Sequence, residues 1–163
     1  LFKEAGGLLP PEYINALLGL TKGSIGETSA IILIIVGFIM LRYVVVKWQG
    51  AMAMIITVPV AVALLPPTAE IVGHAPWVVN PILFLLGSPT LLLALFFVTD
   101  PATTPNSIAG NVFFGIGVGV LAVLGKLYTS IAGVEMYGIL VMNLATPWLN
   151  NLTFKQSCVV KDT

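Results

Sequence analysis

Long apolar runs that follow one another along the chain constrain its fold more than any other feature. In the first run, 29–46, twelve of the eighteen residues are Ile, Leu, Val or Phe, Arg42 lies near its end, and Lys47 and Trp48 follow it. A helix needs roughly 20 apolar residues to cross the hydrocarbon core of a bilayer. Basic and Trp side chains are typical of the lipid–water interface at the end of such a helix. The run therefore predicts a transmembrane helix.

Four further apolar runs follow, at 50–65, 81–99, 108–127 and 131–149. Pro59 lies inside the second run, and a Gly-Ser-Pro sequence at 87–89 interrupts the third, either as a kink or where the backbone opens onto a cofactor. In the fourth run, Gly115 and Gly119 form a small-xxx-small pair that allows another helix to approach closely. We expect an all-α integral membrane protein with about five transmembrane helices.

The composition excludes several other classes of protein. Of the 163 residues, 58% are hydrophobic and only 9% are charged, whereas soluble domains carry roughly 25% charged residues. Seven basic and seven acidic side chains cancel, so no excess charge indicates nucleic acid. Cys158 is the single cysteine, which excludes an intrachain disulfide. We divide the chain into an extramembrane approach at 1–28, a transmembrane domain at 29–152 and a polar C-terminal tail at 153–163.

Basic residues at the ends of the segments predict the orientation in the membrane. The side of the C-terminal tail carries Arg42, Lys47, Lys155 and Lys161, and the opposite side carries Lys3, Lys22 and Lys126. Cytoplasmic loops hold the excess of Lys and Arg in membrane proteins. The distribution predicts a cytoplasmic C-terminus. Because the chain begins at Leu1 without a Met, we expect it to be a piece of a longer polypeptide.

A glycine-rich cluster precedes the first apolar run. Its members are Gly23, Ser24, Gly26, Glu27, Thr28 and Ser29. Ser24 and Glu27 have the spacing of a capping box, and Thr28 or Ser29 can cap the following helix. A glycine-rich segment that leads into a helix N-terminus also offers backbone N–H groups to an anion or a carbonyl. The cluster is therefore either a helix start or a binding site.

A second polar cluster follows the third run, at Thr99, Asp100, Thr103 and Thr104. An acid at the edge of an apolar span has to be paired, hydrated or used in function. One interpretation is that Asp100 caps the turn with Pro101, and the other is that it binds the ring N–H of a heterocycle or a cation. Glu135 and Asn143, eight residues apart, lie roughly on one face of the last helix. They predict either helix–helix hydrogen bonding or an ion pathway.

Three segments together resemble one family of membrane proteins. They are Gly-Ser-Ile-Gly-Glu-Thr-Ser at 23–29, Phe-Val-Thr-Asp-Pro at 97–101, and Met-Tyr-Gly-Ile-Leu-Val-Met-Asn at 136–143 with Pro147 after it. In this order they resemble the D subunit of the Rnf complex and the B subunit of the sodium-translocating NADH:quinone reductase, over about residues 8 to 152. The sequence Thr-Asp-Pro-Ala-Thr-Thr-Pro at 99–105 favours the Rnf member.

The resemblance implies a fold and a cofactor. Family members have ten helices in two inverted five-helix halves, similar to urea transporters, and this chain would be the second half. They carry an FMN linked through its phosphate to a threonine shortly before the glycine-rich cluster. We therefore expect the acceptor threonine upstream of Leu1. Thr146, in a superficially similar Ala-Thr-Pro, lies inside the last run and is discounted.

The resemblance also implies a function. The chain would belong to a flavin-carrying subunit of an Rnf-type ferredoxin:NAD⁺ oxidoreductase, which passes electrons between partner subunits and couples this to Na⁺ or H⁺ transport across the cell membrane. Gly23–Ser29 would line the FMN on the outer side. Thr99, Asp100, Thr103 and Thr104 would serve a riboflavin, a subunit contact or a cation on the other side. The alternatives are the quinone reductase subunit, a urea-transporter-like channel half and an assembly scaffold.

The sequence departs from the family pattern at several charged positions. Members usually have a basic residue on each side of the glycine that matches Gly110, where this chain has Ala109 and Asn111. Asn150 replaces the usual acid after the final proline segment, and the glutamate-glycine that opens the last helix is rearranged to Gly-Val-Glu at 133–135. Roles that depend on those charges are not carried over.

Overall fold

The computed structural model describes residues 11–19, 29–43, 47–65, 80–87, 89–129 and 133–159. Within these residues all regular structure is helical and no strand occurs, which confirms the all-α prediction. The helices are α1 (Pro11–Leu18), α2 (Ala30–Tyr43), α3 (Trp48–Leu64), α5 (Pro81–Gly87), α6 (Thr90–Leu92), the π-helix η2 (Leu93–Phe97), α7 (Ile108–Tyr128) and α8 (Val134–Val159).

Each apolar run contains at least one described helix, but they differ in length. Among the described helices, only α7 is both long and apolar enough to cross a membrane, and its 21 residues extend over about 32 Å. Apolar stretches at Ala30–Met40 and Trp48–Leu64 are shorter. The prediction of five spans and of an inverted repeat therefore stays a prediction.

The third run is broken at the expected place. Helix α5 ends at Gly87 and α6 begins at Thr90, with Pro89 immediately before it. The π-helix follows at once, and the Val98 N–H donates to the Leu93 carbonyl five residues earlier at 2.9 Å. A π-helical turn of this kind is rare and often lies at a functional site. Here it ends immediately before the polar segment that begins with Thr99.

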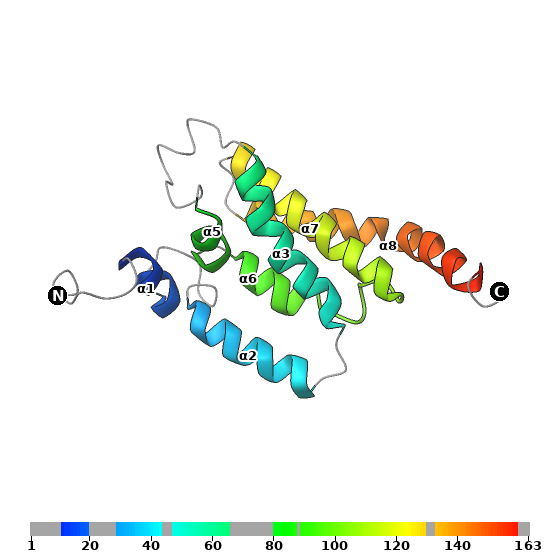
Figure 1. Ribbon diagram of the computed structural model, residues 1–163, viewed down its shortest axis with the longest axis horizontal. Helices are drawn as coiled ribbons and strands as arrows, with labels where there is room; N and C mark the ends of the chain where they lie inside the picture. Colours follow the sequence, from blue (N-terminus) through cyan, green and yellow to red (C-terminus); the bar gives the residue numbers. More distant parts are fainter. Residues whose placement is uncertain are drawn as a thin grey trace.

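The helices pack as a series of neighbours, which Figure 1 shows from one side. Helix α7 packs between α3 and α8, and α3 also contacts α5 and η2. Helix α2 lies on the outside of the bundle, against α6 and η2. The short α1 contacts α5 and the beginning of the bundle at α2.

Two apolar clusters hold this arrangement together. The larger cluster joins α3, α5, α7 and the segment after η2, and its fully buried members include Met54, Val58, Phe84, Val98, Phe114 and Val118. The smaller cluster joins α2 to α6 and η2 through Ala30, Leu33, Leu91 and Leu95. Burying a large apolar side chain stabilises a water-soluble fold by about 1.5–3 kcal/mol. In lipid the same contacts act through van der Waals packing instead.

Glycine permits a very close approach of α3 and α7. A Cβ atom placed on Gly115 would lie only 2.2 Å from the Gly50 carbonyl oxygen and 2.9 Å from the Gly50 carbonyl carbon. Only hydrogen fits at this position. The sequence prediction that Gly115 belongs to a close helix–helix contact is therefore confirmed, and the partner is the main chain of α3.

Large apolar side chains cover the outer surface of the bundle. Ile32 and Phe38 on α2 are 62% and 70% exposed, and Leu144 on α8 is 84% exposed. Water would penalise such a surface, because apolar area is stable only when it is removed from water. Lipid tails provide the matching environment. The surface thus agrees with the prediction of a membrane protein.

The end of α8 differs from the sequence prediction. The sequence predicts that the last apolar run ends at 149 and that a polar tail follows from 153, but the helix continues to Val159. Pro147 lies inside this helix and does not end it. The Thr153 hydroxyl donates to the Leu149 carbonyl at 2.7 Å, so this polar residue bonds back onto the helix. Apolarity defines a membrane span but does not define where a helix stops.

Candidate functional site

The glycine-rich cluster falls almost entirely outside the described residues, which applies to Gly23, Ser24, Gly26, Glu27 and Thr28. Ser29 is described. Its hydroxyl donates to the Leu17 carbonyl at 3.3 Å, and its own carbonyl accepts the Leu33 N–H at 3.2 Å. Ser29 therefore ties α1 to the first turn of α2. Its role toward a flavin stays a prediction.

The polar segment from Thr99 to Thr104 is a tightly bonded turn. The buried Thr99 hydroxyl donates to the Leu95 carbonyl at 2.7 Å, beside the π-helix. One Asp100 carboxylate oxygen accepts the Ala102 N–H at 3.0 Å, and the Thr104 hydroxyl donates to the Asp100 carbonyl at 2.8 Å. The interpretation that Asp100 caps a turn is therefore confirmed by geometry. Two of the three hydroxyl protons in this segment go to main-chain carbonyls.

Side chains from α3 and α8 fix this turn to the bundle. The Lys47 ammonium donates to the Pro105 carbonyl at 2.7 Å and lies 3.4 Å from the Asn106 side-chain oxygen. The Asn106 N–H donates to the Asn150 side-chain oxygen at 2.9 Å. The Thr146 hydroxyl reaches the Thr103 carbonyl at 3.2 Å. Thr103 thus contributes its main chain, and the loop is held from two sides.

Helix α7 begins at the same end of the bundle. Ser107 is its N-cap, because the Ser107 hydroxyl oxygen accepts the Gly110 N–H at 3.0 Å. The same hydroxyl donates to the Thr153 hydroxyl on α8 at 2.6 Å. Lys47, Asn106, Ser107, Asn150 and Thr153 therefore form one network, which we call the Lys47 network. It joins the beginnings of α3 and α7 to the second half of α8.

Asn111 lies next to the Lys47 network, in a position where family members usually carry a basic residue. Its side chain is fully buried, and its nitrogen lies 3.5 Å from the Lys47 carbonyl. Its side-chain oxygen accepts no hydrogen bond from the described residues. A Cβ on Gly50 would lie 2.8 Å from that oxygen, so the amide occupies the close α3–α7 contact.

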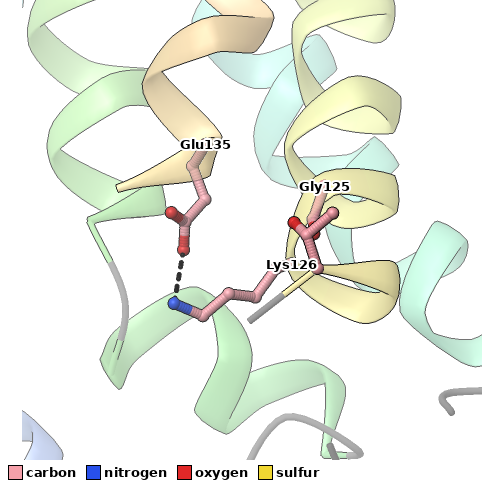
Figure 2. Close-up of polar contacts among 4 residues, drawn as sticks. Gly125, Lys126 and Glu135 are labelled. Atoms are coloured by element: carbon pink, nitrogen blue, oxygen red, sulfur yellow. Dashed lines mark hydrogen bonds and ion pairs between the residues drawn. The ribbon is translucent and has the colours of Figure 1, made fainter. Parts of the chain in front are cut away.

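A buried ion pair lies toward the other end of α7. The Lys126 ammonium is 3.2 Å from one carboxylate oxygen of Glu135, and Figure 2 shows the two side chains reaching toward each other from α7 and α8. Glu135 is fully buried, whereas the Lys126 side chain is 22% exposed. The contact has the distance of an ion pair but not the alignment of a hydrogen bond. Neither Glu135 oxygen accepts a hydrogen bond from the described residues.

Asn143 lies two turns further along α8, about 12 Å from Glu135 along the helix axis. Its side-chain oxygen is also buried and accepts no hydrogen bond from the described residues. Pro147 has no N–H to donate to the Asn143 carbonyl four residues earlier. Among the described residues, the Asn143 side-chain oxygen is therefore a buried acceptor without a donor, and its main-chain carbonyl lacks the usual N–H four residues later. Buried acceptors without donors usually bind water or a cation.

Sequence reasoning found some of these residues and missed others. It singled out Glu135 and Asn143 but not Lys126 as the partner of Glu135. The signal was available, because opposite charges flank the short connection between the fourth and fifth runs. The contacts of Lys47 with Pro105 and of Thr153 with Ser107 were not predicted. Their contacts connect segments more than 40 residues apart, and no local pattern indicates such a pairing.

Helices that pack side by side, with apolar side chains outward and polar groups gathered near their ends, define a helical membrane protein. The model of the NQR2, RnfD, RnfE family matches residues 2–158, and the chain belongs to this family. The resemblance drawn from the three sequence segments is thereby confirmed.

Three curated relatives are similar over most of this chain, and each is the D subunit of a named complex. That of the proton-translocating ferredoxin:NAD(+) oxidoreductase complex of Clostridium ljungdahlii is 31% identical over 86% of this chain and 41% of its own length. The D subunit of the ion-translocating oxidoreductase complex of Stutzerimonas stutzeri is 33% identical over 85% of this chain and 38% of its own length. The D subunit of the Na(+)-translocating ferredoxin:NAD(+) oxidoreductase complex of Acetobacterium woodii is 28% identical over 92% of this chain and 43% of its own length. The chain thus spans about two fifths of these relatives.

Proposed function

We propose that this chain is part of a membrane subunit of a redox-driven ion translocase of the Rnf type, with other membrane and peripheral subunits as its partners. The family match over residues 2–158 carries the proposal. The three relatives named above are all D subunits of such complexes, which favours the Rnf type over the quinone reductase type. The apolar outer surface supports a location in the cell membrane. The proposed orientation has a cytoplasmic C-terminus.

We propose that the subunit carries FMN at the side of the glycine-rich segment, on a threonine upstream of Leu1. A flavin supplies the electron-transfer chemistry, and the protein supplies position and electrostatics. For the Thr99–Thr104 turn, the internal bonds of Thr99 and Thr104 favour a structural role or a subunit contact over a riboflavin site. Their hydroxyl protons are already donated to main-chain carbonyls.

We propose further that Glu135 and Asn143 belong to the path of the transported ion. Both carry buried oxygens without hydrogen-bond donors among the described residues, and both lie on α8. Ionisable and polar groups inside a membrane bundle commonly mark ion pathways. The ion is Na⁺ or H⁺, the two cations that the names of the relatives mention.

In-gel fluorescence of the full-length subunit tests the flavin. The subunit is denatured, separated on a gel and viewed under ultraviolet light. A covalently bound flavin gives a fluorescent band. A Thr146→Val variant is the matched control and keeps the fluorescence, because the Thr146 hydroxyl is bonded to the Thr103 and Met142 carbonyls. A dark wild-type band, together with no flavin released from the native protein, refutes the flavin proposal and favours a channel half without a redox role.

A further inference from the structure

The carboxylate of Glu135 is buried with less compensation than a structural ion pair requires. It is fully buried, one oxygen lies 3.2 Å from the Lys126 ammonium, and neither oxygen accepts a hydrogen bond from the described residues. A buried charge is stable only when a partner and hydrogen bonds replace its water. No described residue donates to the second oxygen, which can therefore accept a positive group.

The surroundings of the pair leave the lysine side chain as the part that can move. The end of α7 is fixed, since the Thr129 N–H donates to the Gly125 carbonyl at 2.9 Å and the Thr129 hydroxyl donates to the same oxygen. A Cβ on Gly125 would lie 2.9 Å from a methyl carbon of Val134, so α7 and α8 are already in tight contact there. Of the two partners, Lys126 has the longer stem, which ends in four rotatable methylene groups. Figure 2 shows the long stem of Lys126 reaching across to Glu135 from beside Gly125.

The Lys126 side chain is partly exposed, whereas the Glu135 side chain is buried. The Lys126 side chain is 22% exposed at the last turn of α7, and Glu135 is 0% exposed. A lysine stem near a helix end can carry its ammonium to the membrane interface. When the ammonium withdraws, the buried carboxylate needs another cation of the same charge. The exchange of one monovalent cation for another leaves the net charge of the site unchanged.

We propose that Glu135 is a monovalent-cation site, for Na⁺ or a proton, and that the Lys126 ammonium is its built-in competitor. The inference rests on the proposed function, because it specifies how an ion enters the pathway of such a complex. Asn143, whose buried side-chain oxygen lies about 12 Å further along α8, is the next acceptor for a cation released from Glu135.

The test measures cation-dependent thermal stability of the purified full-length subunit in detergent. NaCl is titrated against choline chloride at constant ionic strength, which separates Na⁺ binding from screening. In Lys126→Met the competitor is gone, and the Na⁺ concentration for half-maximal stabilisation falls by about tenfold or more. In Lys126→Arg the concentration rises, because a guanidinium can engage both carboxylate oxygens. Glu135→Gln removes the Na⁺ effect.

A proton in place of Na⁺ gives a different signature. Lys126→Met then shows no Na⁺-specific stabilisation but gains an infrared carbonyl band of a protonated carboxyl group, and this band is absent in the Lys126→Met/Glu135→Gln double variant. The double variant carries no buried charge and keeps the comparison valid if a single variant unfolds. The proposal is overturned if neither signature occurs and Lys126→Arg behaves as the wild type. Fluorescence of the flavin is scored separately, so the cation site and the redox function can fail independently.

Discussion

Replacing Gly115 by Ala is the sharpest test of the close α3–α7 packing. The added methyl group would lie 2.2 Å from the Gly50 carbonyl oxygen, whereas real Cβ atoms essentially never approach below 3.0 Å. The obstacle is main chain, so no rotamer change relieves it. Helices α3 and α7 have to separate, and this disturbs the apolar cluster around Met54 and Phe114.

The expected magnitude follows from two opposing effects. Alanine in place of glycine favours the helix by about 1 kcal/mol. Overpacking of a well-packed contact costs typically about 1–3 kcal/mol and sometimes more. Because this contact is short and rigid, we expect the upper part of that range, and Gly115→Ala destabilises the protein by about 2 kcal/mol net.

Gly119→Ala is the matched control on the same helix. A Cβ there would lie 3.3 Å from the Cβ and 3.4 Å from a methyl carbon of Thr57, so a shift of a few tenths of an ångström is enough to admit it. We expect stability equal to the wild type or higher by up to about 1 kcal/mol. Trp fluorescence during unfolding of the full-length subunit in mixed detergent measures both variants. If Gly115→Ala is as stable as Gly119→Ala, the close approach of α3 and α7 at Gly50 is wrong.

Two further variants test the end of the bundle that holds the Thr99–Thr104 turn. Ser107→Ala removes the N-cap of α7 and lowers the unfolding free energy by about 1 kcal/mol, whereas Ser107→Asp retains an acceptor for the Gly110 N–H and loses less in the same detergent unfolding assay. Lys47→Met removes the donor to the Pro105 carbonyl, so hydrogen exchange of the amides of 102–104 and 106 becomes faster while that of α7 is unchanged; equal exchange in both proteins would show that Lys47 does not hold the turn.

Local sequence pattern predicted the helices and the main breaks between them. Apolar runs of suitable length have one physical solution in lipid, because every backbone polar group has to be bonded within its own helix. The Gly-Ser-Pro sequence at 87–89 predicted the break in the third run, since proline removes a donor and clashes with the preceding turn. Residue type is sufficient to predict helices and their breaks, because both depend on local backbone hydrogen bonding.

The pairing of polar groups could not be predicted in the same way. The sequence left two interpretations of Asp100 open, a turn cap and a ligand of a heterocycle or cation. In the folded chain its carboxylate accepts the Ala102 N–H, as a turn cap does. Lys47 reaches a carbonyl 58 residues away, a contact that exists because α3 packs against α7. Glu135 was recognised as an acid at membrane depth, but its burial and its partner Lys126 follow from the packing of α7 on α8.

The sequence by itself determined that the chain is helical, that it belongs in lipid and which family it resembles. These properties follow from apolar runs and short segments, each of which acts through its own residues. The tertiary structure alone decided which polar atoms meet and which have no donor among the described residues, as at the Glu135 carboxylate. The physical reason is that hydrogen bonds and ion pairs require atoms within about 3–4 Å. Distances between atoms on different helices are set only by how the helices pack.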